Sequence, residues 1–384
     1  MRVGCRVARQ RSNRGITWVA TDRTVNCVGD PMNQARFLTV VFLSIAAAWP
    51  AGAEEPQSPA GDRNPAALLA ELQSLRHKIL VEAYSLNNWE LFVMNADGTG
   101  RKNLTNTPAV HELYPQASPD GRKICFLADV QANGQTTRSV HCMNADGSNR
   151  FLVAKGARQP CWSPDSRKIA FVKQEFKRFR IDDYVSKGLF FYDVKTGKTT
   201  EHVNKKIHHL YGLSWAGDGK WLIATVHGGM GYGHAILAIE MNGQKVHDLK
   251  IGGCRPCFSP DGSKVTWSRN DHTICVGNVE LTQKKATVSN VTIVDYHKKM
   301  HLYHPDFSPD GKYITYSVGP GGRVRASGPG THTQVAEMVG VRGKWNVFLK
   351  PVTGTGPRVQ LTNSEEQSNK ESEWISRPVV SEGM

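Results

Sequence analysis

A short peptide, Ser-Pro-Asp-Gly, recurs along this chain and is followed within two residues by a basic residue and then by an apolar run. It occurs in full at 118–121, 259–262 and 308–311, with degenerate copies at 163–166 and 216–219. Proline presets φ at the first turn position, Asp bonds its own backbone and Gly tolerates positive φ, so each copy predicts a tight turn. The copies start 45, 53, 43 and 49 residues apart, which is the length of a four-stranded propeller blade with variable loops.

The residues after each turn have the composition of β-strands. Residues 123–127 and 168–172, for example, are rich in Ile, Val and Phe. Five units begin with a visible inner strand, and a sixth is split between the two ends of the repeat region. We therefore expect an all-β, six-bladed β-propeller over residues 79–376. Its last strand, at 373–376, would pair with the strand that begins at Ile79, which closes the ring and leaves no sheet edge exposed.

The segment before the repeats has a different pattern. Residues 37–48 form a twelve-residue apolar stretch, preceded by Arg36 and followed by Ala-Gly-Ala at 51–53. This pattern is typical of a secretory signal peptide, and it is too short for a transmembrane helix. We expect the signal peptide to occupy 32–53, and we interpret 1–31 as a disordered extension upstream of the true start.

Residues 54–78 are expected to be a linker followed by a short helix. Asn64 is suited to cap a helix over 65–77, with Pro65 at its first position. At the other end, residues 377–384 are expected to be a tail.

The mature chain expected after removal of residues 1–53 is basic. The full sequence has 48 Lys and Arg and 34 Asp and Glu, of which 7 and 2 lie in residues 1–53, leaving 41 against 32 and a charge of +9. Such a balance favours an anionic partner such as a cell-wall polymer or an acidic glycan. The alternative is a solvated basic surface with no dedicated partner. Export argues against nucleic acid as the partner.

Six cysteines follow the expected signal peptide. Cys125 and Cys142 are placed to face each other across a hairpin, and Cys254 and Cys257 have the spacing of a redox or metal pair. Pro256 favours extended backbone between the latter two, and the chain has no second such pair. Buried free thiols and disulfides both remain open, with free thiols favoured.

The order of an apolar residue or Trp, Ser-Pro-Asp-Gly, a β run and an Asn-Ala-Asp-Gly turn (95–98 and 144–147) resembles the TolB-type propeller repeat over residues 79–376. The resemblance implies a propeller in the cell envelope that binds partner proteins. TolB carries a separate N-terminal α/β domain, for which the roughly 25 residues between the expected cleavage site and the first strand leave no room. The resemblance therefore implies the propeller more firmly than the Tol-system role.

Irregular sequence is concentrated in the loops that join second and third strands of the blades. These include 173–180, which is basic with interleaved aromatics, 227–234, and the long segment 319–343 with Arg323, Arg325 and His332. In a propeller such loops share one face with the loops that enter the inner strands. We expect function on this face, with 173–187 and 319–343 contacting an envelope protein or an anionic glycan.

Histidines, tyrosines and cations recur at fixed positions before the turns. Counting back from the first turn residue, His stands at −7 in three blades, Tyr at −5 in two, and cations at −5 or −4 in three, one of them Lys370. These positions converge on the channel mouth, where the cations would bind carboxylates or phosphates. The candidate ligand-binding residues are His111, Arg158, His209, Tyr211, Arg255, His301, Tyr303, His304 and Glu371.

A metal site is the alternative use of these histidines. Three imidazoles with His304 or Glu371 supply ligands suited to Zn²⁺ or Mn²⁺, and residues 304–311 resemble a histidine-bearing stretch of the oligogalacturonate lyases. That resemblance implies a metal-dependent lyase or hydrolase acting on acidic polysaccharide. Histidines spread around a ring can instead lie too far apart to share an ion, since metal–nitrogen bonds are about 2 Å.

Other enzyme signatures are absent from the sequence. Residues 212–216 lack the final glycine of a nucleophile elbow, Pro115 stands where a zincin needs its second histidine, and 229–233 does not have the dinucleotide-binding spacing. We therefore expect a periplasmic or secreted, monomeric and non-enzymatic binding module with no cofactor, no metal, no nucleic-acid partner and no membrane span. A metal-dependent enzyme and a structural scaffold are the alternatives.

Overall fold

The computed structural model of the 384-residue chain describes residues 64–182, 184–325, 333–363 and 368–376. All of them belong to the second of the chain's two compact units, residues 55–384. The expected start-site extension, signal peptide and C-terminal tail lie outside the described residues.

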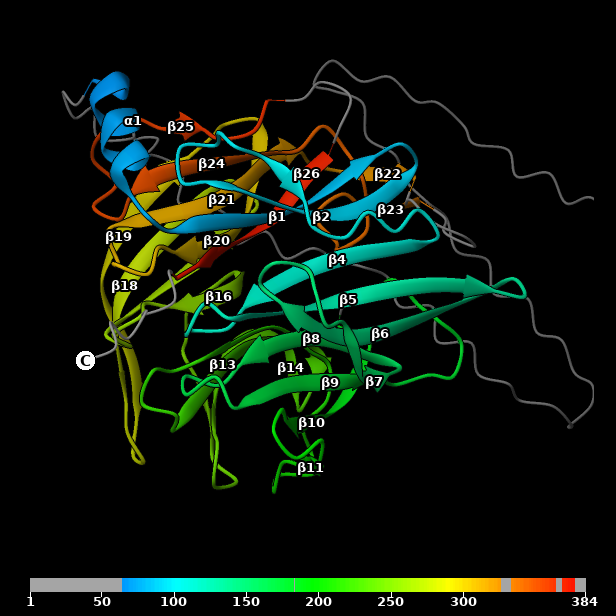
Figure 1. The fold of residues 1–384 in the computed structure, drawn as a ribbon. Helices are drawn as coiled ribbons and strands as arrows, with labels where there is room; N and C mark the ends of the chain where they lie inside the picture. The colour runs from blue at the N-terminus through cyan, green and yellow to red at the C-terminus, as the bar shows by residue number, and fades with distance from the viewer. Residues whose placement is uncertain (1–63, 183, 326–332, 364–367, 377–384) are drawn as a thin grey trace, which may run out of the picture. The chain divides into compact units, whose positions relative to one another are not determined.

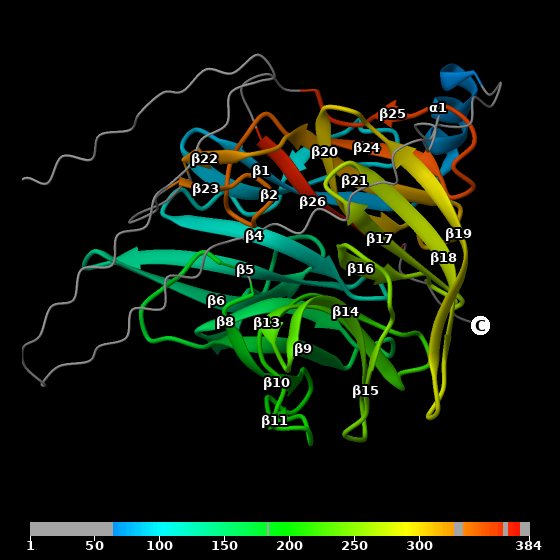
Figure 2. The ribbon, with the colours of Figure 1, turned by 180° about the vertical axis from the view of Figure 1, so that it is seen from behind.

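Six four-stranded antiparallel sheets form the blades of a β-propeller, which Figures 1 and 2 show from two opposite sides. The first two sheets contain β4 (Val110–Ala117), β5 (Lys123–Ala132), β6 (Gln135–Asn144) and β7 (Phe151–Lys155), and then β8 (Ala157–Trp162), β9 (Lys168–Gln174), β10 (Ser186–Asp193) and β11 (Thr199–Glu201). The next two contain β12 (Leu210–Trp215), β13 (Trp221–Gly229), β14 (Tyr232–Glu240) and β15 (Val246–Asp248), and then β16 (Cys254–Phe258), β17 (Lys264–Asn270), β18 (Thr273–Leu281) and β19 (Ala286–Tyr296). The last two contain β20 (Met300–Phe307), β21 (Tyr313–Pro320), β24 (Asn346–Pro351) and β25 (Val359–Gln360), and then β26 (Ser368–Ile375), β1 (Lys78–Ser85), β2 (Asn88–Asn95) and β3 (Lys102–Asn103). The prediction of a six-bladed propeller is confirmed.

The sheet that contains both β26 and β1 joins the two ends of the repeat region. Trp374 lies opposite Ile79 in an antiparallel register, so the last strand of the chain is the inner strand of the blade that β1 begins. The strand starts at Ser368, five residues earlier than expected. The two central strands, β1 and β2, are thereby each hydrogen-bonded on both sides, β1 to β26 and β2 to β3.

A single helix and a small ribbon complete the described structure. Helix α1 (Pro65–Ser74) is capped by the Asn64 side chain, which accepts a 3.0 Å hydrogen bond from the Ala66 amide; it ends three residues before the predicted end. Its Leu68 and Leu72 pack in a cluster that includes Trp374. The ribbon of β22 (Arg323–Arg325) and β23 (Thr333–Val335) lies within the connection from β21 to β24. No described helix is long and apolar enough to cross a membrane.

The Ser-Pro-Asp-Gly turns owe their sequence to a repeated set of side-chain bonds. Ser118 donates from Oγ to Asp120 Oδ1 at 2.6 Å and accepts from the Lys123 amide at 2.9 Å, while Asp120 accepts from the Arg122 amide. Corresponding Ser–Asp bonds recur in the turns at 163, 259 and 308. These bonds satisfy backbone donors that the turn would otherwise leave unpaired.

Because neighbouring strands are antiparallel, the connections separate into two faces of the disc. We call the face with the Ser-Pro-Asp-Gly turns the turn face. We call the opposite face the loop-rich face; it carries the loops between second and third strands and those that lead into the inner strands. In Figure 1 the β5–β6 hairpin and the β22–β23 ribbon extend toward the loop-rich face, at the right of the picture.

A candidate binding channel and its two mouths

Each inner strand has a β-bulge at the same place. It lies four residues before the residue that begins the following turn, or before the equivalent position 375 in β26. At every one of these points the ladder register shifts and one residue has φ between 50° and 60°. Such bulges bend a strand and redirect a side chain. The six residues form a ring around the central channel and are Tyr114, Gln159, Gly212, Arg255, His304 and Glu371.

The amides of the bulged residues are satisfied by polar side chains of neighbouring strands. Tyr114 donates to buried Glu82 at 2.7 Å, Arg255 donates to Thr225 at 2.8 Å, and Gly212 donates to Gln159 at 2.8 Å. A buried backbone donor without a partner is costly. These bonds therefore hold the ring in its strained backbone conformation.

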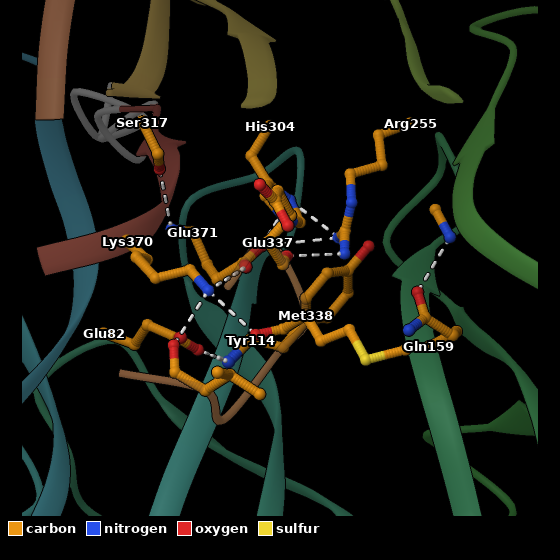
Figure 3. A network of polar contacts seen from close by, with 12 residues as sticks. Glu82, Tyr114, Gln159, Arg255, His304, Ser317, Glu337, Met338, Lys370 and Glu371 are labelled. Atoms are coloured by element: carbon orange, nitrogen blue, oxygen red, sulfur yellow. Dashed lines mark hydrogen bonds and ion pairs between the residues drawn. The ribbon is translucent and has the colours of Figure 1, made fainter. Parts of the chain in front are cut away.

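Three predicted site residues from three adjacent blades meet in this ring (Figure 3). The Arg255 guanidinium donates to His304 Nδ1 at 3.2 Å and lies 3.8 Å from Glu371 Oε2, and the His304 ring also contacts Glu371. The Arg255 and Glu371 side chains are only 6% and 2% exposed. The arrangement is a buried cation–carboxylate cluster at the base of the channel.

A second polar layer lies two residues further along the inner strands, at position −2 from the turn. The Cys257 thiol donates to Asp306 at 3.1 Å, and the Gln116 amide donates to Glu373 at 3.1 Å. Burial raises the pKa of Asp306 to about 6, and burial together with the nearby Asp306 charge raises the pKa of Glu373 well above its ordinary value. The two carboxyls lie close enough for the charge of Asp306 to raise the pKa of Glu373, so ionisation of one opposes ionisation of the other.

Both layers line one cavity of about 490 Å³. It extends from Arg255 and Glu371 past Asp306 and Glu373 to the turn prolines Pro119, Pro164, Pro260 and Pro309. The cavity therefore reaches the turn face. The expectation that function belongs to the loop-rich face did not include this opening.

Two loops cover the channel on the loop-rich side. The segment 336–341 is held by Lys370, whose Nζ donates to the carbonyls of Ala336, Met338 and Val341 at 3.0, 2.8 and 3.2 Å. Arg255 adds a 3.0 Å bond to the Glu337 carbonyl. Ile181, from the β9–β10 loop, packs against Val341. The two loops thus meet over the channel.

The Arg158 guanidinium, a predicted ligand-binding group, bonds to a neighbouring loop. It donates to the carbonyls of Arg180 and Asp182, at 2.8 Å for Arg180, and the residue is fully buried. Like Lys370, it fixes a loop. The predicted positive channel mouth is therefore largely committed to loop carbonyls.

The three histidines at position −7 do not converge. His111 accepts from the Trp89 amide at 3.2 Å, His209 contacts Glu175 at 2.6 Å, and His301 contacts Glu337. Burial lowers the pKa of His111; burial also opposes protonation of His301, but the bond to Glu337 outweighs it and raises that pKa. Within residues 64–182, 184–325, 333–363 and 368–376, no group of three or more His, Cys, Asp and Glu side chains is placed to hold one metal ion.

The two predicted tyrosines also have separate partners. The Tyr211 hydroxyl is 3.1 Å from His234 Nε2, and the Tyr303 hydroxyl donates to Asp271. The Arg255 guanidinium carbon also lies over the Tyr211 ring, 5.6 Å from the ring centroid. Of the nine predicted residues, the structure brings together Arg255, His304 and Glu371, with Tyr211 beside them. His332 lies outside the described residues.

Sequence reasoning missed Gln116, Cys257, Asp306 and Glu373. The signal was present, because strand side chains alternate with a period of two. If position −4 faces the channel, position −2 faces it as well. Counting −2 from each turn would have found the carboxyl pair.

No family model matches the chain. Among curated proteins it is 25% identical over 158 residues to an uncharacterized peptidase, YuxL, of Bacillus subtilis, and 25% identical over 251 residues to dipeptidyl-peptidase 5 of Porphyromonas gingivalis. The matches cover 41% and 59% of this chain but only 21% and 32% of those proteins. The chain thus spans a fifth to a third of the length of these relatives.

Among solved structures, TolB of Acinetobacter baumannii superposes with a TM-score of 0.54 over 78% of this chain and 66% of that one, at 17% identity. This chain has a TolB-like propeller fold. At this identity the likeness concerns the fold alone. What the TolB-like propeller binds must be argued from its own surfaces.

Proposed function

We propose that this TolB-like propeller is a non-enzymatic binding module of the cell envelope that docks an anionic partner on its loop-rich face. The observation that carries the proposal is the charge of that face. Its described loops expose many cations, while most of their acids are engaged. The exposed cations include Lys177, Arg178, Lys206, Lys299, Arg323, Arg342 and Lys344.

The acidic residues of the same loops leave this positive charge largely uncompensated. Glu175 contacts His209, Glu337 is buried against His301, and Asp182 pairs with Arg180 at 3.1 Å. Asp271 is the exposed exception among the described loop residues. A surface with an excess of one sign attracts partners of the opposite sign and speeds their association.

Apolar side chains are exposed among these cations. Leu86, at the tip of the β1–β2 hairpin, is 98% exposed, and Phe176, beside Lys177, is 50% exposed. Val130 of β5 and Val335 of β23 are exposed as well. Mixed apolar and basic contacts are typical of binding surfaces, and they favour a partner with its own apolar groups over a purely diffuse counter-ion layer.

The buried cations beneath the face support its use as a platform. Arg158 and Lys370 fix the β9–β10 loop and segment 336–341 by bonds to their carbonyls. A surface that is ordered before binding loses less conformational entropy on binding. The loop-rich face is thus suited to recognition without rearrangement.

The proposal is tested by charge reversal at two adjacent exposed cations. Lys177→Glu/Arg178→Glu should weaken binding to the acidic partner by about tenfold, and raised salt should weaken wild-type binding, because exposed charges act through a screened field. The matched control is Lys195→Glu/Lys198→Glu, which changes the charge equally at an exposed turn on the other face.

The probes are polygalacturonate for an acidic glycan and poly-glutamate for an acidic protein, measured by biolayer interferometry. Preference for one probe identifies the class of partner. Equal loss in the two double variants, or no binding of either probe, would contradict a dedicated site on the loop-rich face.

Placement in the envelope rests on the expected signal peptide over 32–53. We propose that residues 32–53 direct export. Fusing residues 1–53 or 32–53 to alkaline phosphatase, which is active only after export, tests this placement. Inactive fusions would contradict the proposed location in the cell envelope. They would leave the proposal of a binding site on the loop-rich face unaffected.

A further inference from the structure

The channel presents a second, chemically different surface, and it is reached from the turn face. Its cavity of about 490 Å³ has the size of a small-molecule site. The loop-rich side above it is covered by segment 336–341 and by the β9–β10 loop, held by Lys370 and Arg158. A ligand would therefore enter between the turn prolines.

The charges in the cavity wall leave an excess of carboxyl groups. Arg255 and His304 both contact Glu371, so these three compensate one another. Asp306 and Glu373 remain, and none of the described residues that line the cavity is a lysine. The chain is basic as a whole, yet this cavity is acidic where it leads toward the turn face.

The hydrogen bonds to these two carboxyls come from neutral donors. Asp306 accepts from the Cys257 thiol and from the Trp374 amide, each at 3.1 Å, and Glu373 accepts from the Gln116 amide. Neutral donors stabilise a carboxylate less than a cation does. Two adjacent carboxyls in this setting ionise together only when a cation compensates them.

An independent observation in the same wall indicates a missing partner. Ser372, between Glu371 and Glu373, is 5% exposed and lines the cavity, and its hydroxyl has no hydrogen-bond partner within the part of the chain that the structure describes. Buried hydroxyls are ordinarily satisfied. A polar ligand in the cavity would supply the bond.

Aromatic rings complete the wall. Trp162, Trp215, Phe258, Phe307 and Trp374 all line the cavity. Rings attract an organic cation through their electron-rich faces, and their area suits an apolar body attached to the charge. Carboxylates together with aromatic rings are the chemistry that recognises organic ammonium groups.

We propose that the channel is a binding site for a small organic ligand that carries a primary ammonium group, with the ammonium held by Asp306 and Glu373 and the attached body against the aromatic wall. The three N–H donors of the ammonium can bond to the oxygens of both carboxyls, and its positive charge lets both ionise. A bare metal ion fits less well, because the described residues supply no cluster of three ligands.

The test compares two probes that differ in charge and hardly in shape. Benzylamine and benzyl alcohol are titrated into the purified protein by calorimetry at neutral pH. We expect benzylamine to bind at least about tenfold more tightly, because only its ammonium compensates the carboxyl pair. Equal affinity of the two probes, or no binding of either at millimolar concentration, would overturn the proposal.

Variants locate the site. Asp306→Asn and Glu373→Gln should each remove most of the preference for benzylamine, because each leaves one carboxyl instead of two. The matched control is Glu280→Gln, an exposed carboxylate of β18, which should leave it unchanged. Thermal melts check that each variant folds. An unchanged preference in the folded channel variants would also overturn the proposal.

The site is independent of the proposed docking face. Lys177→Glu/Arg178→Glu should bind benzylamine like the wild type, because these residues lie on the opposite face from the opening. Loss of polyanion binding and loss of benzylamine binding therefore separate the two proposals.

Discussion

Lys370 of β26 donates a 2.8 Å hydrogen bond from Nζ to the carbonyl oxygen of Met338, so a fully buried lysine of one blade holds the loop that extends from the neighbouring blade (Figure 3). Burial lowers the pKa of this lysine, while Glu371 and Glu82 oppose the shift. Lys370 and Arg255 thus both hold segment 336–341 over the channel on the loop-rich side.

Replacing this lysine by an apolar residue of similar length should destabilise the fold. Lys370→Met removes a donor from three carbonyls, of which that of Met338 keeps a bond from the Val341 amide, and it removes the cation beside Glu371, so we expect the free energy of unfolding to fall by about 3 kcal/mol. Urea denaturation measures it. The control, Lys344→Met at an exposed position, should change it by less than about 0.5 kcal/mol. Similar effects of the two substitutions would contradict the anchoring role.

Glu82 should make stability depend on pH. Burial, and then the charge of Glu371, raises its pKa to about 8, against the opposing effects of Lys370 and the Tyr114 amide. The folded protein therefore binds more protons than the unfolded chain between the ordinary glutamate pKa and about 8. The contribution of Glu82 to the free energy of unfolding is fully present below the pKa that this carboxyl has in the unfolded chain. It is lost as the pH rises from that value to about 8.

Glu82→Gln should remove that contribution while keeping an oxygen acceptor for the Tyr114 amide. We expect the fall in unfolding free energy between pH 5 and pH 8 to become shallower by up to about 1.4 kcal/mol per pH unit. Asp306, with its own raised pKa, preserves part of the slope. Urea titrations at several pH values measure it, with exposed Glu71→Gln as control. A slope equal to that of the wild type would refute the assignment.

The six described cysteines should be unreactive in the folded protein. All six are free, and burial raises the pKa of Cys142 to about 12 and that of Cys275 to about 11. Since the thiolate is the reactive form, Ellman's reagent at pH 8 should modify them slowly, and all six rapidly after unfolding in guanidinium. In protein without residues 1–53, which contain the other two of the eight cysteines, fewer than six reactive thiols after unfolding would show a disulfide, first of all between Cys125 and Cys142, which lie opposite each other in the β5–β6 register.

The separate partners of His111, His209 and His301 also predict the metal content. Protein purified without a chelator and without a histidine tag should contain well under one Zn or Mn per chain, because three separated imidazoles offer no shared site. Elemental analysis measures this directly. About one metal per chain, lost in His209→Ala/His301→Ala, would favour the metal-dependent lyase or hydrolase instead.

The number of blades and the ring of bulges were both accessible from the sequence, for a shared physical reason. Turn chemistry depends on three or four neighbouring residues, so Ser118, Asp120 and their counterparts mark each blade wherever the chain goes. The same frame places Arg255, His304 and Glu371 at one level of the channel. Their contact follows from the repeat.

What Arg158, Lys370 and the carboxyl pair do was decided by the tertiary structure alone. Arg158 and Lys370 share the frame of the expected ligand-binding residues, but their partners are carbonyls of loops whose paths no local pattern determines. Asp306 and Glu373 are 67 residues apart in sequence, and they influence each other's ionisation only because closure of the ring brings β20 beside β26. Local sequence therefore determined the architecture of this protein, whereas its charges acquired their roles from long-range packing, where burial and the nearest neighbour set each group's protonation and partner.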